Sequence, residues 1–82
     1  MMSKVQGRAV HRLSNRGTRP AVVVLEPWGG EYDIGPNEAL DLVVEGDLDA
    51  RLEIEMGDSH LTITSDGPDL TITRDGKPVA AR

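Results

Sequence analysis

A chain of 82 residues with a formal net charge of −5 is long enough for one small domain. It contains no Cys and no Phe, and only one Trp and one Tyr, so disulfides and thiolate metal sites are excluded and the core must be aliphatic. No run approaches the ~18 apolar residues of a membrane span, and the basic N-terminus lacks the apolar stretch of a secretory signal. We therefore expect a cytoplasmic protein without a membrane segment.

The charges are separated along the chain. The first 25 residues contain five basic and no acidic residues, whereas the other 57 contain four basic and 14 acidic ones. The two parts thus carry formal charges of +5 and −10. This separation indicates either that the two parts attract each other or that the basic part binds something else.

The first predicted element is the basic segment near residues 8–14. In and around this segment, basic residues recur every four positions, at Lys4, Arg8, Arg12 and Arg16. In a helix, that spacing would place them on one face. In a strand, Arg8 and Arg12 share one face, while Ala9 and Leu13 share the other. Because Gly7 weakens a helix and a turn-like sequence follows, we favour the strand.

Alternation of apolar and polar residues predicts most of the later strands. It is clearest in Arg51–Met56, where every second residue is apolar and the others are charged. Residues 21–25 are continuously apolar, which is typical of a strand covered on both faces. Short sequences rich in Asp and Gly separate the runs and predict turns. We expect seven strands, near residues 8–14, 20–26, 31–34, 39–45, 50–56, 59–65 and 69–74.

Short strands at regular spacing predict an all-β fold, either a small antiparallel β-sandwich or a partly open barrel. We expect a single domain over residues 1–82, in which 1–7 form a flexible arm and 77–82 a loose tail. A chain of this size buries only about 60% of its unfolded surface. Since it has no disulfide, self-association is one way for it to gain stability.

The segment Leu25–Tyr32 resembles a motif of a group of small, uncharacterised bacterial β-proteins. Their pattern is an Asn-rich turn, a Val-rich strand, Glu-Pro-Trp-Gly-x-Glu-Tyr, a Pro-Gly-Glu-like turn, an acidic strand and a C-terminal Asp-Gly turn. The resemblance covers residues 13–78, with Asn37 at the position where the group has Gly. It implies a compact β domain, and it implies no reaction.

The same turn is the best candidate binding surface. Its residues are Glu26, Trp28, Gly29, Glu31 and Tyr32. It holds both aromatic residues of the chain, with a carboxylate on either side, and Trp and Tyr are enriched at binding hot spots. In the alternative, Trp28 caps one end of the aliphatic core and Tyr32 packs against it.

Patterns for catalysis and metal binding are weak. Asp58, Ser59 and His60 have the residue types of a hydrolase triad, but neighbours in a strand cannot converge on one point. The two histidines show no diagnostic metal spacing. The acidic loop Glu45–Asp49 lacks the ligand spacing of an EF-hand. We expect no enzyme, no cofactor and no metal site.

The five positive charges of the basic segment could neutralise phosphates of a nucleic acid, but no aromatic residue interleaves with them and the acidic remainder would repel a polyanion, so nucleic acid is not the expected partner. We expect Arg8 and Arg12 instead to engage outward acidic residues such as Glu53 and Glu55, within one chain or across a subunit boundary. The sequence thus predicts a non-enzymatic binding or assembly module acting through protein–protein contacts, with itself as a homo-oligomer or with another protein. The alternative is a small-ligand or cation (Ca²⁺) binding domain that uses the acidic loop and the Trp28 turn.

Overall fold

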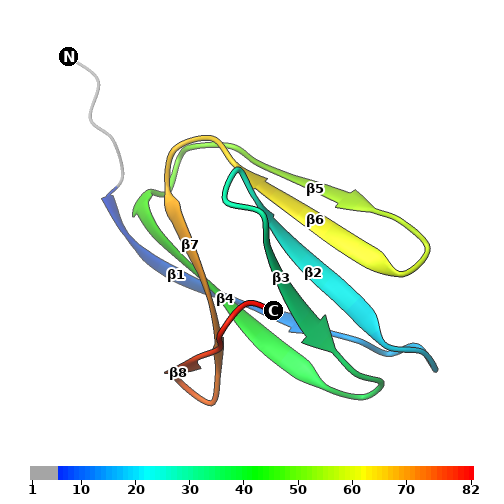
Figure 1. Ribbon diagram of the computed structural model, residues 1–82. Coiled ribbons are helices and arrows are strands. Elements are labelled where there is room, and N and C mark those ends of the chain that lie inside the picture. Colours follow the sequence, from blue (N-terminus) through cyan, green and yellow to red (C-terminus); the bar gives the residue numbers. More distant parts are fainter. Residues whose placement is uncertain (1–5) are drawn as a thin grey trace.

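The computed structural model describes residues 6–82, which form eight strands in two sheets (Figure 1). The strands are β1 (Gln6–Ser14), β2 (Ala21–Glu26), β3 (Gly30–Ile34), β4 (Ala39–Asp47), β5 (Leu52–Met56), β6 (His60–Ser65), β7 (Asp69–Arg74) and β8 (Lys77–Pro78). One sheet has the order β1-β4-β7-β8 and the other the order β3-β2-β6-β5. The predicted all-β sandwich is confirmed, and the seven predicted strands correspond to β1–β7.

Most strand pairs are antiparallel, and β2 and β6 form a parallel pair. Across residues 6–82 there is no helix, and so none that is long and apolar enough to cross a membrane. Residues 1–5 of the arm predicted over 1–7 lie outside the described part of the chain, whereas Gln6 and Gly7 already belong to β1.

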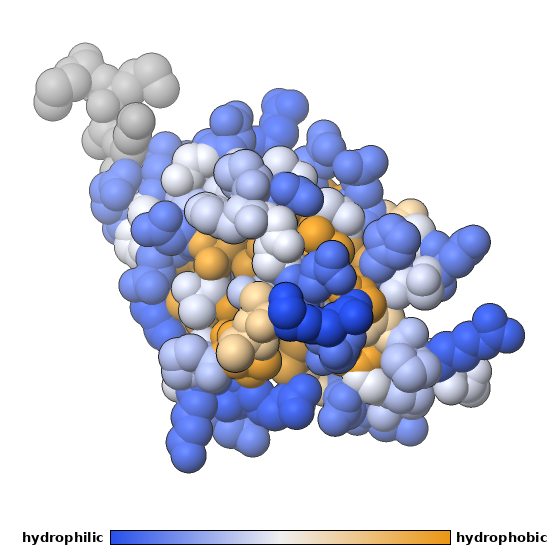
Figure 2. Space-filling view, viewed as in Figure 1, coloured by the Kyte–Doolittle hydropathy of each residue, from blue (hydrophilic) through white to orange (hydrophobic). Residues whose placement is uncertain are grey.

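The core lies between the two sheets and is aliphatic, as the composition predicted. Its buried cluster consists of Val23, Leu25, Ile34, Leu40, Leu42, Val44, Ile63, Leu70 and Ile72. These residues alternate with outward-facing neighbours along their strands, so each sheet presents one apolar face to the other. Figure 2 shows hydrophobic residues in the middle of the face in view, surrounded by hydrophilic ones.

The basic segment forms the strand that we favoured, and that strand is an edge of the first sheet. β1 pairs only with β4, so that Arg8 stands opposite Glu45 and Arg12 opposite Asp41. Opposite charges thus stand next to each other across the two strands, although neither pair is among the salt bridges of residues 6–82. Within one chain the basic strand therefore lies beside acidic residues of β4, and not beside Glu53 and Glu55 of β5, which belongs to the other sheet.

The C-terminal segment closes one side of the sandwich. β8 pairs with β7 at the edge of the first sheet, and the chain then crosses to β3 at the edge of the second. There the Arg82 backbone N–H donates to the Glu31 carbonyl (2.8 Å), and the guanidinium lies 3.2 Å from Glu31 Oε1 and 3.1 Å from Asp33 Oδ1. Residues 77–82 thus connect the two sheets, in place of the loose tail that we predicted.

Truncation of the core residue Ile63 tests the position of the core. Ile63 is fully buried (0% exposed), so Ile63→Ala should lower the free energy of unfolding by about 2–5 kcal/mol, as lost burial and a residual cavity add. Val10→Ala is the control, because Val10 is 50% exposed and should change stability by less than about 1 kcal/mol. Urea unfolding at one fixed protein concentration measures both, and equal losses would contradict this description of the core.

Candidate functional site

The β2–β3 turn brings the two aromatic side chains to one place. The turn is tight, with a cis peptide bond before Pro27, Gly29 at a φ of 80°, and the Gly29 N–H donating to the Leu25 carbonyl (2.6 Å). Trp28 lies in this turn and is 54% exposed. Tyr32 stands opposite the buried Val23, so its side chain lies on the inner face of the sheet. The two aromatic side chains therefore differ in exposure: Trp28 is largely exposed to solvent, whereas Tyr32 faces the interior.

A cavity of about 360 Å³ lies between this turn and the beginning of β7. Leu25, Trp28, Gly30 and Tyr32 form the wall that belongs to β2, β3 and their turn. The facing wall comes from the other sheet and contains Glu45, Asp69, Leu70 and Thr71. Glu45 and Asp69 are cross-strand partners in β4 and β7 and alternate with the buried Val44 and Leu70, so both lie on the outer face of their sheet and contribute to the cavity at its rim.

Gly30 is what allows Tyr32 to form part of this wall. A Cβ atom at Gly30 would lie 3.1 Å from the Tyr32 hydroxyl oxygen and 3.2 Å from Cε1. Both distances are shorter than ordinary van der Waals contacts. The ring therefore lies across the backbone of Gly30, in space that any other residue would occupy with its side chain.

The carboxylates predicted to flank the aromatic pair are not the ones that line the cavity. Glu31 stands opposite Val24, so it faces the outer side of the sheet, away from Tyr32, and it pairs with Arg82. Glu26 is not among the lining residues either. Glu45 and Asp69 take that place, and the sequence could not indicate them because their strands reach the turn only through the packing of the two sheets.

The second candidate surface is the open side of the sandwich, where β1 and β5 are the edges of the two sheets. Ile54 and Met56 stand opposite Ile63 and Leu61 of β6, so their side chains lie on the inner face of their sheet. Ile54 is nevertheless 56% exposed and Met56 86% exposed. The inner face of β5 is therefore apolar but uncovered.

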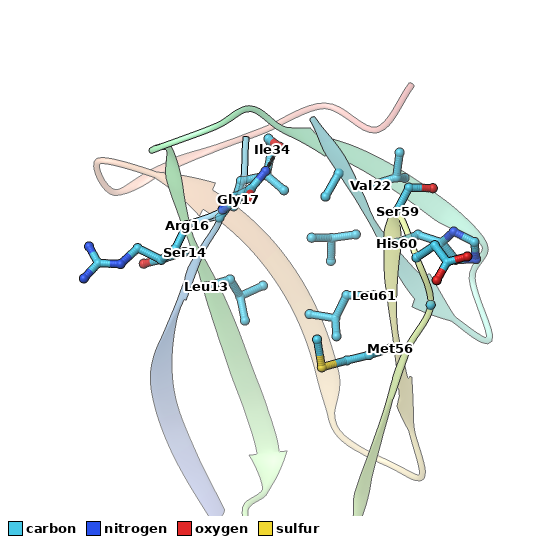
Figure 3. A pocket seen from close by; sticks show the side chains of 15 residues that line it. Leu13, Ser14, Arg16, Gly17, Val22, Ile34, Met56, Ser59, His60 and Leu61 are labelled. Carbon is cyan, nitrogen blue, oxygen red and sulfur yellow. Dashed lines mark hydrogen bonds between the residues drawn. The ribbon is translucent and has the colours of Figure 1, made fainter. Parts of the chain in front are cut away.

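A groove of about 310 Å³ lies at one end of this open side. Figure 3 shows Leu13 of β1 on one side of the groove, and Leu61 and Met56 of the β5–β6 hairpin on the other. His60 lies at the rim with Asp58 and Ser59, all three in or beside one hairpin turn. The groove thus joins the apolar edges of both sheets.

The outer faces of the same two edges carry opposite charges. Arg8 and Arg12 are exposed on β1, and Glu53 and Glu55 are exposed on β5. Within residues 6–82, the salt bridges are formed by Arg74 and Arg82, and Arg8 and Arg12 take part in none of them. Both predicted basic site residues are therefore free to meet acidic groups of a partner.

The described residues contain no group of three His, Cys, Asp or Glu side chains placed to hold a metal ion. In the acidic loop, the Asp47 carboxylate accepts a hydrogen bond from the Asp49 backbone N–H (3.0 Å). The loop thus uses one of its carboxylates to stabilise its own turn.

Comparisons with known protein families, curated proteins and solved structures find no match for this chain. The resemblance to small bacterial β-proteins at the Trp28 turn therefore stays a prediction. Functional proposals depend on the two surfaces themselves.

The contact between Gly30 and Tyr32 can be tested with a double-mutant cycle. Gly30→Val should destabilise the protein by about 1–3 kcal/mol, because the added side chain displaces the Tyr32 ring. In the double variant Gly30→Val, Tyr32→Ala the clash is absent, so the two costs should not add. Urea unfolding followed by the emission of Trp28 measures all three variants, and simple additivity would show that the ring does not lie across Gly30.

Proposed function

We propose that this chain is a non-enzymatic assembly module that binds a second copy of itself through the open side of its sandwich. The observation that carries the proposal is the uncovered inner face of β5, where Ile54 and Met56 are 56% and 86% exposed although they continue the core face of their sheet. Contiguous apolar side chains of this kind are characteristic of interaction surfaces.

In a dimer with two-fold symmetry, each copy would cover the exposed inner face of β5 of the other. An axis along the open side, midway between the sheets, exchanges the two layers, so β1 of each copy comes beside β5 of its partner. Ala9 and Leu13, on the inner face of β1, would then lie next to the partner's Ile54 and Met56. Such an isologous contact closes after two copies.

Charge complementarity supports the same arrangement. The axis also makes the outer faces continuous, so the exposed Arg8 and Arg12 come beside the partner's Glu53 and Glu55. The basic strand would thus have acidic residues on both sides. Glu53 and Glu55 of the partner would lie on one side, and Glu45 and Asp41 of its own chain lie on the other. Complementary charges at the rim of an interface favour the correct partner and register more than they add affinity.

Backbone groups give a third argument. β1 and β5 each have one neighbour in their sheet, so the other side of each strand presents unpaired N–H and C=O groups. If β1 paired with the partner's β5, the unpaired backbone groups of both strands would form hydrogen bonds. In each layer of the dimer, a four-stranded sheet of one copy would then continue into a four-stranded sheet of the other. We place this assembly in the cytoplasm, where a chain without cysteine is insensitive to reducing conditions.

Charge reversal tests the pairing of β1 with β5. Arg8→Glu, Arg12→Glu should convert the dimer to a monomer, since carboxylates would then face Glu53 and Glu55. The variant Glu53→Arg, Glu55→Arg should do the same. An equimolar mixture should recover dimers, because both contacts of the heterodimer join opposite charges.

Size exclusion with light scattering distinguishes these species. The matched control is Arg19→Glu, Lys77→Glu, which changes the net charge equally at exposed positions outside β1 and β5. A wild-type protein that stays monomeric at every concentration, or a mixture that fails to recover dimers, would refute the proposed pairing. A second protein as the partner would then be the remaining form of the assembly hypothesis.

Polar substitution on β5 tests the apolar part of the contact. Ile54→Ser, Met56→Ser should raise the dimer dissociation constant at least tenfold, which corresponds to about 1.4 kcal/mol. Each monomer should lose little stability, because both side chains are already exposed. Val10→Ser is the control, since Val10 is also exposed but lies on the outer face of β1. Analytical ultracentrifugation measures the constants, and an unchanged value would place the contact elsewhere.

A further inference from the structure

We propose that the cavity beside the Trp28 turn is a binding site for an organic cation, either an alkylammonium or a guanidinium group. The inference goes beyond self-assembly, because this cavity lies between β3 and β7, on the side of the sandwich opposite the β1 and β5 edges. Its volume of about 360 Å³ lies within the range of sites for small organic ligands, ~300–1,000 Å³.

The aromatic wall selects for positive charge. The faces of Trp and Tyr rings attract ammonium and guanidinium groups that approach within ~6 Å. Trp28 and Tyr32 are the only two aromatic residues of the chain, and both line this one cavity. Leu25, at the same wall, offers an apolar contact for the carbon stem of the ligand.

Negative charge lies at the rim of the cavity. Glu45 and Asp69 are exposed and adjacent across β4 and β7, and neither takes part in the salt bridges of residues 6–82. Arg8, which stands opposite Glu45 on β1, lies beyond salt-bridge distance in the described structure. Two carboxylates therefore stay available to accept hydrogen bonds from a cationic ligand.

The edge of β7 adds a backbone acceptor. β8 pairs only with Thr73 and Arg74, and Val79 beyond it donates to the Ile72 carbonyl. Because backbone groups two residues apart in a strand point to the same side, the Leu70 carbonyl points to the edge that faces the cavity, where no strand of residues 6–82 pairs with it.

The same composition disfavours a calcium ion at this cavity. Ca²⁺ takes about 6–8 oxygen ligands, and here half of the lining is aromatic and aliphatic. The carbon skeleton of an organic cation can contact the apolar and aromatic residues, and its charged group can approach the carboxylates. A free amine or guanidine and the side chain of Lys or Arg on another protein share this chemistry.

Trp28 is the single tryptophan, so its fluorescence reports binding in the cavity directly. The full-length protein is titrated with N-acetyl-lysine methylamide and N-acetyl-arginine methylamide, whose ends carry no charge. The matched probe N-acetyl-norleucine methylamide has the same stem without the ammonium group. We expect a saturable change with the cationic probes and at least tenfold weaker binding of norleucine. Equal binding of norleucine would overturn the proposal, because the cavity would then recognise only the stem.

Amide substitutions test the carboxylates. Glu45→Gln, Asp69→Asn should weaken binding of the lysine probe at least tenfold, whereas the matched control Asp49→Asn, Asp66→Asn should retain it. Asp69→Asn alone, at an exposed position, serves if the double variant does not fold. An affinity of the folded amide variant equal to that of the wild type would overturn the proposal.

Two further experiments are needed. The first identifies the source of the cation, and the second distinguishes this proposal from the proposed self-assembly. A capped Ala-Ala-Lys-Ala-Ala peptide that binds at least tenfold more tightly than butylammonium would identify a protein side chain as the ligand, and equal affinities would identify a small amine. Ile54→Ser, Met56→Ser should leave lysine binding unchanged, since β5 is remote from the cavity. Loss of binding in that variant would overturn an independent site, whatever the oligomeric state proves to be.

Discussion

A narrow aliphatic core holds the two sheets together, and its width determines which surfaces of the protein stay exposed. All nine residues of the buried cluster come from β2, β3, β4, β6 and β7. The edge strands β1 and β5 contribute none of them, although both present apolar side chains to the interior. Leu13 of β1 and Leu52 of β5 pack against the cluster, but the rest of the inner face of these two strands is left largely uncovered.

The two sides of the sandwich differ in how far the apolar residues at their edges are covered. On one side the C-terminal segment crosses from β8 to β3 and is held there by Arg82. On the other side no segment of residues 6–82 crosses, and Ile54 and Met56 stay in contact with solvent. Burial of an aliphatic side chain contributes about 1.5–3 kcal/mol, so leaving two such residues uncovered is a sizeable loss for a domain this small. A second copy of the chain would recover it.

The local patterns of the sequence predicted the strands well, because alternation and turn chemistry depend only on neighbouring residues. Asn37, for example, adopts a φ of 62°, the left-handed conformation that its place in a Pro-Asn-Glu turn requires. The same patterns could not predict which strands are neighbours. The pairing of β1 with β4, the parallel pair of β2 with β6 and the anchored C-terminus all join segments far apart in the sequence.

The same limit explains how far the candidate site could be predicted. Trp28 and Tyr32 were recognisable because they are the only aromatic residues and lie four positions apart. Glu45 and Asp69 had no such mark, since one belongs to an acidic loop sequence and the other to a turn between strands. They become a pair only through the register of β4 and β7, and they line the same cavity as the aromatic residues only because the two sheets pack together. The chemistry of the cavity is therefore a property of the fold: each residue type was visible in the sequence, and their convergence was not.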